Sequence, residues 1–388
     1  MQGSLTDLNQ AKTIITQIWQ EAVNEVKGEK AVKKVLENKE LVKPDQIIAI
    51  GKAATSMFKA AFDHYDQQLQ ENETLGGLII TKYDHTEIVP SHIEQLESSH
   101  PIPDQNSLNA GQAALNLVKS MKEDSHLLLL VSGGASSLAE VLTDTKTLKD
   151  LFTLNSELLS SGADIETINT KRKLISEIKG GKLLSNFKGK QITTIAISDV
   201  PDGNLEILGG GIGSGVLINK ETTNFTSHLA ATNEIARSKA AETAKVLGFE
   251  IIENSENLYE DIIPLSETLA QRLKTGPKGI YIWGGEPTVK LPENPGKGGR
   301  NQALGLLLAK EINDLENICL IVAGTDGTDG PTNAAGAIID GQTFQNPDIG
   351  EIAIKEANAG PYLKSNDALF TSGPTGTNVM DLIVALKF

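Results

Sequence analysis

The chain has 388 residues, of which 39% are hydrophobic and 22% are charged, and its formal net charge is −15. This charge argues against nucleic acid and anionic membranes as partners, because both carry negative charge themselves. The single cysteine, Cys319, lies in an apolar run, so a disulfide framework and a thiolate-rich metal site are excluded and a reducing compartment is expected.

The N-terminal residues show no basic start followed by an apolar block, and no apolar run approaches the roughly 18 residues needed to cross a bilayer. We therefore expect a cytoplasmic protein. The length predicts two domains. With 36 glycines and only 4% aromatic residues, the composition favours layered α/β domains over an aromatic-packed β-sandwich.

The first predicted element is helical: residues 7–38 carry apolar side chains at helical spacing. A short β-branched strand, Ile47–Ile50, follows and leads through Gly51 and Lys52 into the strong helix former AATSMFKAAF. Another strand is expected at Gly77–Thr81. This region therefore begins with a strand–helix unit that has Lys52 at its junction.

The same alternation continues to the end of the chain. Helices are expected at 106–122, 148–160 and 235–247, and further strands begin near Leu127, Ile192, Gly279 and Ile318. Alternating strands and helices predict mostly parallel sheets, whose strands are continuous Val/Ile/Leu runs. The composition changes after about Thr222, so we place a domain boundary near residues 222–232 and divide the chain into 1–227 and 228–388.

Five predicted strands end in polar or glycine-rich segments. These segments are GK (51–52), SGGASS (132–137), SDVPDG (198–203), GGEPT (284–288) and AGTDGTDG (323–330). In open α/β sheets the ligand crevice lies beyond the carboxyl ends of the strands. We therefore expect these five segments to converge on one site.

Two of the segments are suited to anions. Backbone amides of Ser132, Gly133 and Gly134, with the Ser136 hydroxyl, could cradle an anion at a helix start, although a tight turn with a serine cap explains the same pattern. Lys52 lies near a helix N-terminus, where a cation is unfavourable unless an anion is present. A solvated lysine is the alternative.

Basic residues gather at two further places. INTKRKLISEIKGGKLL (168–184) is the densest basic patch and contains Arg172 and Lys179, although a solvated helical face would have the same composition. GKGGRNQAL (296–304) places Arg300 and Asn301 after paired glycines. Arginine can bind a carboxylate or a phosphate with two parallel hydrogen bonds, which favours a binding role for Arg300 over that of a surface residue.

Four carboxylates occupy matching strand ends: Asp199, Glu286, Asp326 and Asp329. Each could be a turn or cap residue, but together they suit Mg²⁺ or the orientation of a hydroxyl group. The six histidines lack the spacing of a zinc site, and the chain contains no P-loop, no GxGxxG and no GxSxG motif.

In this order, GKAA, HPIPD, VSGGASSL, INTKRKLISEIKGGKL, ISDVPDG, GGEPTV, GGRNQAL and AGTDGTDGPTNAAGA resemble the segments of the class II glycerate kinases, or glycerate 2-kinases, with an MOFRL-type C-terminal domain. The resemblance covers nearly the whole chain. It implies transfer of the γ-phosphoryl group of ATP to the 2-hydroxyl of D-glycerate, with Mg²⁺. It also implies an N-terminal Rossmann-like kinase domain and an MOFRL-type domain, each α/β with a mostly parallel sheet flanked by helices, and an active site in the cleft between them.

The resemblance also implies roles for residues. Lys52 and Arg300 match the residues regarded as the catalytic pair, and we add Asp326 to them as a candidate for orienting the hydroxyl. Asp199 and Asp329 are the candidate metal ligands. The candidate contacts of substrate and nucleotide are Ser132, Gly133, Gly134, Ser136, Arg172, Lys179, Asp199, Glu286 and Asn301.

Two other functions stay open. One is a hydroxypyruvate reductase, which would need a nicotinamide site that no GxGxxG motif supports. The other is a non-catalytic relative that binds a hydroxy acid or a nucleotide, against which the presence of Lys52, Arg300 and both aspartates argues. The expected partners are small molecules, and a homodimer is one option for the oligomeric state.

Overall fold

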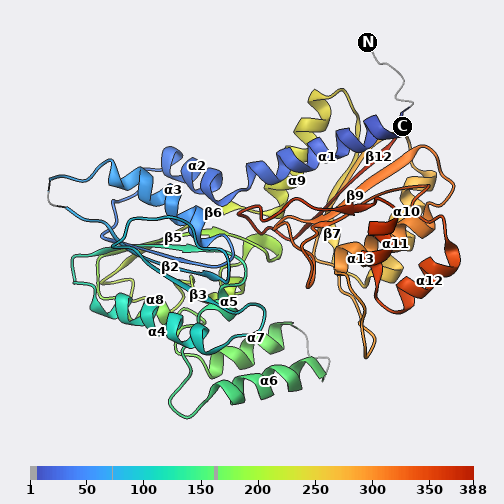
Figure 1. Ribbon diagram of the computed structural model, residues 1–388. Helices are drawn as coiled ribbons and strands as arrows, with labels where there is room; N and C mark the ends of the chain where they lie inside the picture. Colours follow the sequence, from blue (N-terminus) through green and yellow to red (C-terminus); the bar gives the residue numbers. More distant parts are fainter. Residues whose placement is uncertain (1–6, 72, 161–164) are drawn as a thin grey trace. The chain divides into compact units, whose positions relative to one another are not determined.

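A computed structural model describes residues 7–71, 73–160 and 165–388 (Figure 1). The chain forms two compact units. Unit 2 consists of 27–232 and 376–378, whereas unit 1 combines 1–26 with 233–375 and 379–388. The chain therefore crosses between the units four times, and the short segment 376–378 joins unit 2 although its neighbours on both sides belong to unit 1.

Unit 2 is built on a parallel sheet of six described strands in the order β3-β2-β1-β4-β5-β6. Its inner strands are continuous apolar runs, as expected for strands buried on both faces. The strands are β1 (Gln46–Ile50), β2 (Gly76–Lys82), β3 (Glu94–Ser98), β4 (His126–Val131), β5 (Gln191–Ile197) and β6 (Asn224–Ala231).

Helices cover both faces of this sheet. In Figure 1, α2 (Gly28–Asn38) and α3 (Ala54–Asp66) lie on one face, and α4 (Gln105–Ser120) and α8 (Lys182–Ser185) lie on the other. The remaining helical segments of the unit are α5 (Ala135–Leu138), α6 (Leu148–Ser160), α7 (Ile165–Leu174) and two 3₁₀ turns, η1 (Pro201–Gly203) and η2 (Leu208–Gly211).

Unit 1 contains a second sheet, whose six described strands have the order β11-β10-β9-β12-β8-β7. They are β7 (Ile251–Leu258), β8 (Gly279–Gly285), β9 (Ile318–Gly324), β10 (Gly336–Asp340), β11 (Leu369–Phe370) and β12 (Asp381–Lys387). Only β7 and β8 pair in parallel; the pairs β8–β12, β12–β9, β9–β10 and β10–β11 are antiparallel in the described part of the chain.

The prediction of a mostly parallel sheet is therefore correct for unit 2 and wrong for the pairing within unit 1. The reason is β12, which inserts between β8 and β9 and runs against both. Because β8 and β9 both oppose β12, they still point the same way, so their glycine-rich ends still meet at one edge. The antiparallel β12 begins at that edge: Asp381 pairs with Gly285 of β8 and with Gly324 of β9.

The helices of unit 1 also lie on two faces of its sheet. Contacts place α1 (Leu8–Glu25) and α9 (Asn233–Val246) against each other and against β12. Within the other layer, α11 (Arg300–Glu311) packs on β9 and β10 and contacts α10 (Ile262–Thr275), α12 (Pro347–Lys355) and α13 (Ala359–Ser365). The Trp19 ring of α1 meets the Phe370 ring of β11 edge to face at 5.1 Å.

The predicted single helix over 7–38 is two helices, since α1 ends at Glu25 and α2 begins at Gly28. The break coincides with a crossing between the units. As a result α1 belongs to the same unit as the last strand, whereas the predicted division placed it in the N-terminal domain. Among the residues described, no helix combines the length and apolar character that a membrane span requires.

Candidate active site

Lys52 lies in unit 2 at the turn between β1 and α3. Its backbone N–H donates to the carbonyl of Gly133 at 2.9 Å, and the next amide, that of Ala53, donates to the Ser132 hydroxyl at 3.0 Å. Ser132 itself is fully buried at the end of β4, where its N–H donates to Ile50. The structure thus joins the GK and SGG segments, two of the five expected to converge, through direct hydrogen bonds, because β1 and β4 are neighbours in the sheet.

The SGG segment is crowded by side chains from four other parts of unit 2. A Cβ at Gly133 would lie 2.0 Å from Oδ2 of Asp199 and 2.3 Å from Nδ2 of Asn378. A Cβ at Gly134, whose φ is +86°, would lie 3.2 Å from Cγ of Lys52 and 3.0 Å from the His100 ring. These glycines are therefore needed for close approach, and they bring Lys52 and Asp199 to the same turn.

Asp199 follows β5 and is held from a distant part of the chain. The amide of Asn378, on the three-residue segment that joins unit 2, donates to Asp199 Oδ2 at 3.0 Å. The helix that begins at the SGG turn, α5, has only four residues. Its dipole is correspondingly short, so the backbone turn and Lys52 have to supply most of any attraction for an anion.

Ser136, Arg172 and Lys179 lie together in unit 2, around a small cavity of about 20 Å³ that Glu140 also lines. Lys179 is only 2% exposed and forms an ion pair with the fully buried Glu140. Burial lowers the pKa of Lys179 although Glu140 acts in the opposite direction, and burial also lowers the pKa of Arg172. This arrangement favours a structural role for Lys179 over the predicted direct contact with substrate.

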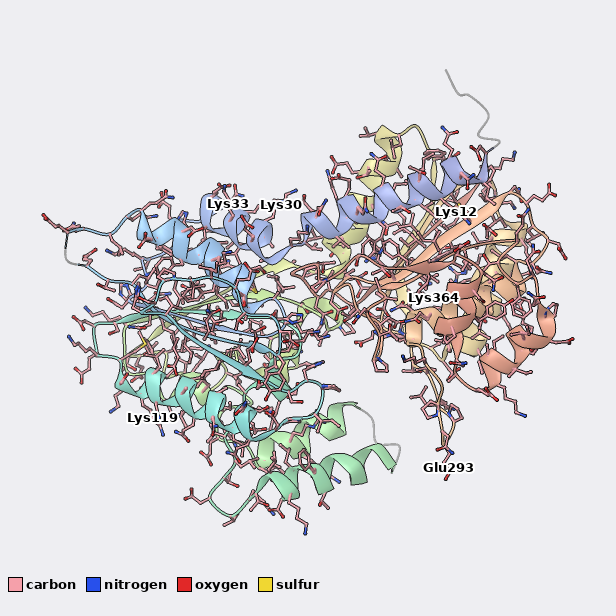
Figure 2. The ribbon with its side chains drawn as sticks, in the orientation of Figure 1. Lys12, Lys30, Lys33, Lys119, Glu293 and Lys364 are labelled. Carbon is pink, nitrogen blue, oxygen red and sulfur yellow. The ribbon has the colours of Figure 1, made fainter. Side chains whose placement is uncertain are left out.

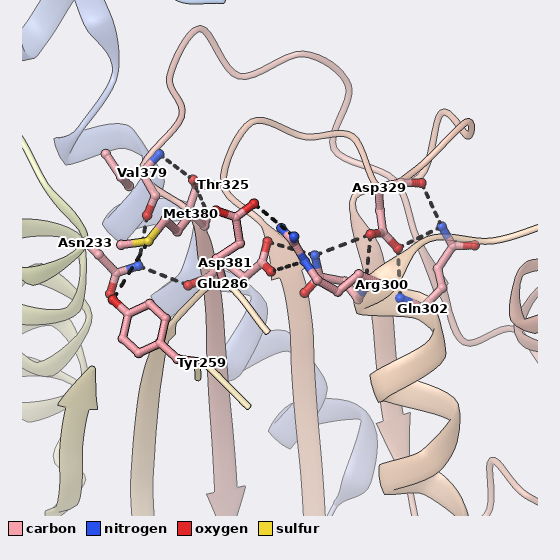
Figure 3. Close-up of polar contacts among 11 residues, drawn as sticks. Asn233, Tyr259, Glu286, Arg300, Gln302, Thr325, Asp329, Val379, Met380 and Asp381 are labelled. Carbon is pink, nitrogen blue, oxygen red and sulfur yellow. Dashed lines mark hydrogen bonds and ion pairs between the residues drawn. The ribbon is translucent and has the colours of Figure 1, made fainter. Parts of the chain in front are cut away.

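Arg300 is the first residue of α11 in unit 1 and lies between two carboxylates (Figure 3). Its Nη1 donates to Oε1 of Glu286 at 2.9 Å, and its Nε lies 2.8 Å from Oδ2 of Asp381. Burial disfavours the charge of Arg300, but the two carboxylates outweigh this effect and raise its pKa above the ordinary value. Arg300 therefore stays charged at any physiological pH.

The two partners of Arg300 differ in environment. The side chain of Asp381 is 3% exposed, whereas that of Glu286 is 49% exposed. Burial raises the pKa of Asp381 to about 6, although Arg300 and a hydrogen bond from Asn301 act in the opposite direction. Asp381 is consequently ionised at neutral pH and stays next to the guanidinium.

Asp329 holds the N-terminus of α11. Its Oδ1 accepts from the backbone N–H of Asn301 at 3.0 Å, and its Oδ2 accepts from the backbone and side-chain N–H groups of Gln302 at 2.8 and 3.0 Å (Figure 3). The residue is 4% exposed. Because both oxygens already accept hydrogen bonds, this geometry favours a helix-positioning role for Asp329 over metal binding.

Asp326 begins the turn after β9, and its Oδ1 accepts from the backbone N–H and the hydroxyl of Thr328 at 2.9 and 3.1 Å. The turn itself is tied down, because the Thr375 hydroxyl donates to the carbonyl of Thr325. Asp326 is partly exposed next to the buried Asp329. The orientation of its carboxylate is therefore fixed by the turn.

Sequence reasoning missed Asp381, Asn378 and Glu140. The polar groups expected at this edge were those at strand ends, whereas Asp381 is at a strand start and reaches the same edge because β12 is antiparallel. The feature of the sequence that could have indicated Asp381 is its place directly before the apolar run LIVAL at 382–386. Nothing in the sequence pattern indicated that Asn378 would meet Asp199.

A metal ion is implied by the resemblance, so its fit can be tested on these residues. Within the described ranges, no group of three or more His, Cys, Asp or Glu side chains is arranged to hold a metal ion. Mg²⁺ commonly binds one or two protein carboxylates and completes its shell with water and substrate phosphates. A single carboxylate such as Asp199, beside the SGG turn, is compatible with Mg²⁺ that a nucleotide carries.

Comparisons with known proteins agree across the whole chain. Residues 14–246 match a family described as a domain of unknown function (DUF4147), and residues 279–381 match the MOFRL family. A D-glycerate 2-kinase of Thermotoga maritima is 33% identical over 98% of this chain and 99% of that protein. A glycerate 2-kinase of Pyrococcus horikoshii is 34% identical over 88% of this chain and 86% of that protein.

A crystal structure described as a glycerate kinase from Thermotoga maritima superposes with a TM-score of 0.84 and 32% identity, covering 98% of this chain and 100% of that chain. The sequence identity exceeds 30% over nearly the full length, and the chain matches both family models. These two findings together establish the family. The chain belongs to the glycerate 2-kinases that combine a DUF4147 domain with an MOFRL domain.

Proposed function

We propose that this protein transfers the γ-phosphoryl group of ATP to the 2-hydroxyl of D-glycerate, giving 2-phospho-D-glycerate. The observation that carries the proposal is the position of two cations. Lys52 immediately precedes the N-cap of the 13-residue helix α3, and Arg300 is the first residue of the 12-residue helix α11. A helix N-terminus already carries partial positive charge, so a cation there is favourable beside anions. Arg300 lies beside Glu286 and Asp381, and an anionic substrate would be a further partner of the same kind.

Phosphoryl transfer suits such a site, because it requires charge stabilisation and positioning and little covalent chemistry from the protein. Lys52 and Arg300 would bind the transferring phosphoryl group and the carboxylate of glycerate. Asp326, whose orientation its turn fixes, would orient the 2-hydroxyl. The amides of the SGG turn and Asn301 are further candidate contacts. That the site lies in a cleft between the domains stays a prediction.

Asp199 is the candidate ligand for Mg²⁺, because its carboxylate lies beside the SGG turn, where a Cβ at Gly133 would come within 2.0 Å of its Oδ2. When bound to the triphosphate, Mg²⁺ would neutralise part of the phosphate charge. Asn378 would hold the carboxylate in one orientation by donating to Oδ2. A cytoplasmic location and the oligomeric state stay predictions.

The test measures ADP release with D-glycerate and ATP, with the phosphorylated carbon identified by NMR. Lys52→Ala and Arg300→Ala are each expected to lower kcat/KM by about 100-fold or more, the scale of losing a group that stabilises transition-state charge. Matched controls are Lys59→Ala on α3, whose partner is Glu87, and Arg272→Ala, whose partner is Glu253. Both controls should stay within about 3-fold, the effect of an exposed ion pair.

The same preparation is assayed for NADH oxidation with hydroxypyruvate. Reductase activity without ADP release would overturn the proposal, as would near-normal turnover in either site variant. Binding of glycerate and ATP without any turnover would identify the non-catalytic alternative.

A further inference from the structure

We infer that Arg300 has one permanent and one exchangeable counter-ion: Asp381 positions the guanidinium, and Glu286 gives way to an anionic group of the substrate. The inference rests on the proposed function, because it assigns Arg300 to a substrate carboxylate or phosphoryl group. It adds a positioning residue and a competing residue that neither the motifs nor the resemblance assigned to these roles.

The case for Asp381 as the permanent partner starts from its place in the sheet. It is the first residue of β12, a strand paired on both sides, by β8 and β9. Its backbone carbonyl accepts from Nδ2 of the buried Asn233 at 3.0 Å, and its Oδ1 accepts from Nδ2 of Asn301 at 2.9 Å. The backbone carbonyl and Oδ1 of Asp381 thus both accept hydrogen bonds, and its Oδ2 lies 2.8 Å from Nε of Arg300.

The backbone just before Asp381 is held as well. The Thr325 hydroxyl donates to the carbonyl of Met380 at 2.6 Å and accepts from the N–H of Val379 at 2.9 Å (Figure 3). Asn233 also donates to the carbonyl of Val379. A carboxylate fixed in this way keeps its charge in one place beside Arg300, with its Oδ2 2.8 Å from Nε as an ion pair.

Glu286 has the opposite character. It is half exposed and begins the long connection 286–299 between β8 and α11, at whose projecting tip Figure 2 labels Glu293. Like Asp381, Glu286 contacts Arg300 through a single nitrogen, Nη1, so burial and not the number of contacts separates the two carboxylates. Exposed ion pairs are weak, whereas a planar anion bound by two parallel hydrogen bonds interacts more strongly.

The chemical consequence is a guanidinium with two different edges. On the Nε side the charge of the buried Asp381 lies close by, and on the Nη side the hydrogen-bond partner is Glu286, a carboxylate that is 49% exposed. A substrate carboxylate or phosphoryl group has the same charge and acceptor geometry as Glu286, so it can take its place. Glu286 would then compete with substrate and keep Arg300 oriented between turnovers.

The decisive comparison is between Asp381→Asn and Glu286→Gln, a matched pair. Each variant removes one negative charge beside the same guanidinium and preserves the shape of the side chain. Asp381→Asn is expected to lower kcat about 10- to 100-fold, the range seen when a residue that orients a functional group is lost. Glu286→Gln is expected to lower KM for one anionic substrate about 3- to 10-fold and to raise kcat/KM.

A second measurement does not depend on activity. The sequence contains four arginines, Arg172, Arg237, Arg272 and Arg300, so a spectrum of arginine Nε–H groups is simple, and Arg300→Lys assigns the signal of interest. The Nε atom of Arg300 is buried beside Oδ2 of Asp381 without a hydrogen bond of regular geometry, so burial is what should slow the exchange of its N–H. Asp381→Asn should shift that signal and speed its exchange, whereas Glu286→Gln should leave the exchange slow.

The inference is overturned if the two variants change kcat and KM alike, or if they alter the Arg300 signal alike. A wild-type protein that does not phosphorylate D-glycerate would instead overturn the proposed function. In that event the hydrogen-exchange measurement still decides whether Asp381 and Glu286 differ in their effect on the Nε–H group of Arg300.

Discussion

At the scale of single residues, the carboxylates near Arg300 show how burial separates groups of the same chemistry. Asp381 and Glu286 contact the same guanidinium, yet only Asp381 is withdrawn from water. Desolvation disfavours its charged form more than Arg300 favours it, so its pKa lies at about 6 instead of 3.8. An acid whose pKa is higher in the folded protein than in the unfolded chain makes the free energy of unfolding depend on pH.

Between about pH 4 and pH 6 the folded protein keeps a proton on Asp381 that the unfolded chain has lost. Raising the pH through this window therefore lowers the free energy of unfolding, on the order of 3 kcal/mol for a shift of about two units. Urea denaturation at about pH 4.5 and about pH 7.5 should show that Asp381→Asn reduces this loss. Equal pH dependence in both proteins would contradict the raised pKa of Asp381; the charged neighbours Arg300 and Glu286 are present in both.

The buried pair of Lys179 and Glu140 allows a second prediction at this scale. Lys179→Met leaves the Glu140 carboxylate buried without its counter-charge, which should lower the free energy of unfolding by about 3–5 kcal/mol. The double variant Lys179→Met with Glu140→Gln should lose clearly less than the sum of the single variants. Denaturant unfolding of the four proteins measures the coupling, and additive losses would contradict the ion pair.

At the scale of elements, α11 is the helix that positions Arg300, and its N-terminus is capped from a distance. Gly299 at the N-cap has no side chain to accept a hydrogen bond, and Asp329 from the turn after β9 accepts instead. Helix α10 is the natural comparison, because its own N-cap residue, Asp261, accepts from the N–H of Ile263.

Asp329→Ala is expected to lower the free energy of unfolding by more than Asp261→Ala. The exposed local cap should contribute about 1 kcal/mol. Removal of Asp329 leaves buried donors of Asn301 and Gln302 without acceptors, each of which costs about 1–3 kcal/mol. Denaturant unfolding compares the two variants directly, and an equal loss would show that Asp329 is no more than an ordinary cap.

At the scale of the whole molecule, each unit has its own buried core. One hydrophobic cluster is drawn from unit 2, including Ile48, Leu129 and Ile192, and the other from unit 1, including Trp283, Val322 and Ile383. The second cluster depends on the last strand, because β12 lies between β8 and β9 and contributes Ile383 and Ala385 to the core.

Removal of residues 381–388 is therefore expected to unfold unit 1 and leave unit 2 folded. Limited proteolysis with mass spectrometry should yield a resistant fragment covering about residues 27–232. A variant that lacks only Phe388, which is not fully buried, serves as the control and should be as resistant as the intact chain. Cooperative loss of both units in the truncated protein would contradict independent cores.

The sequence by itself determined the strand–helix alternation, the parallel sheet of unit 2 and the family, because these follow from local periodicity and from motifs of adjacent residues. Local periodicity does not specify strand direction, so only the tertiary structure decided that β12 runs antiparallel and brings Asp381 to Arg300. In the run DGTDG the two aspartates are alike in sequence. Their difference, one on a partly exposed turn and one buried under α11, arises from contacts with residues about 28 positions away, and no nearby pattern encodes it.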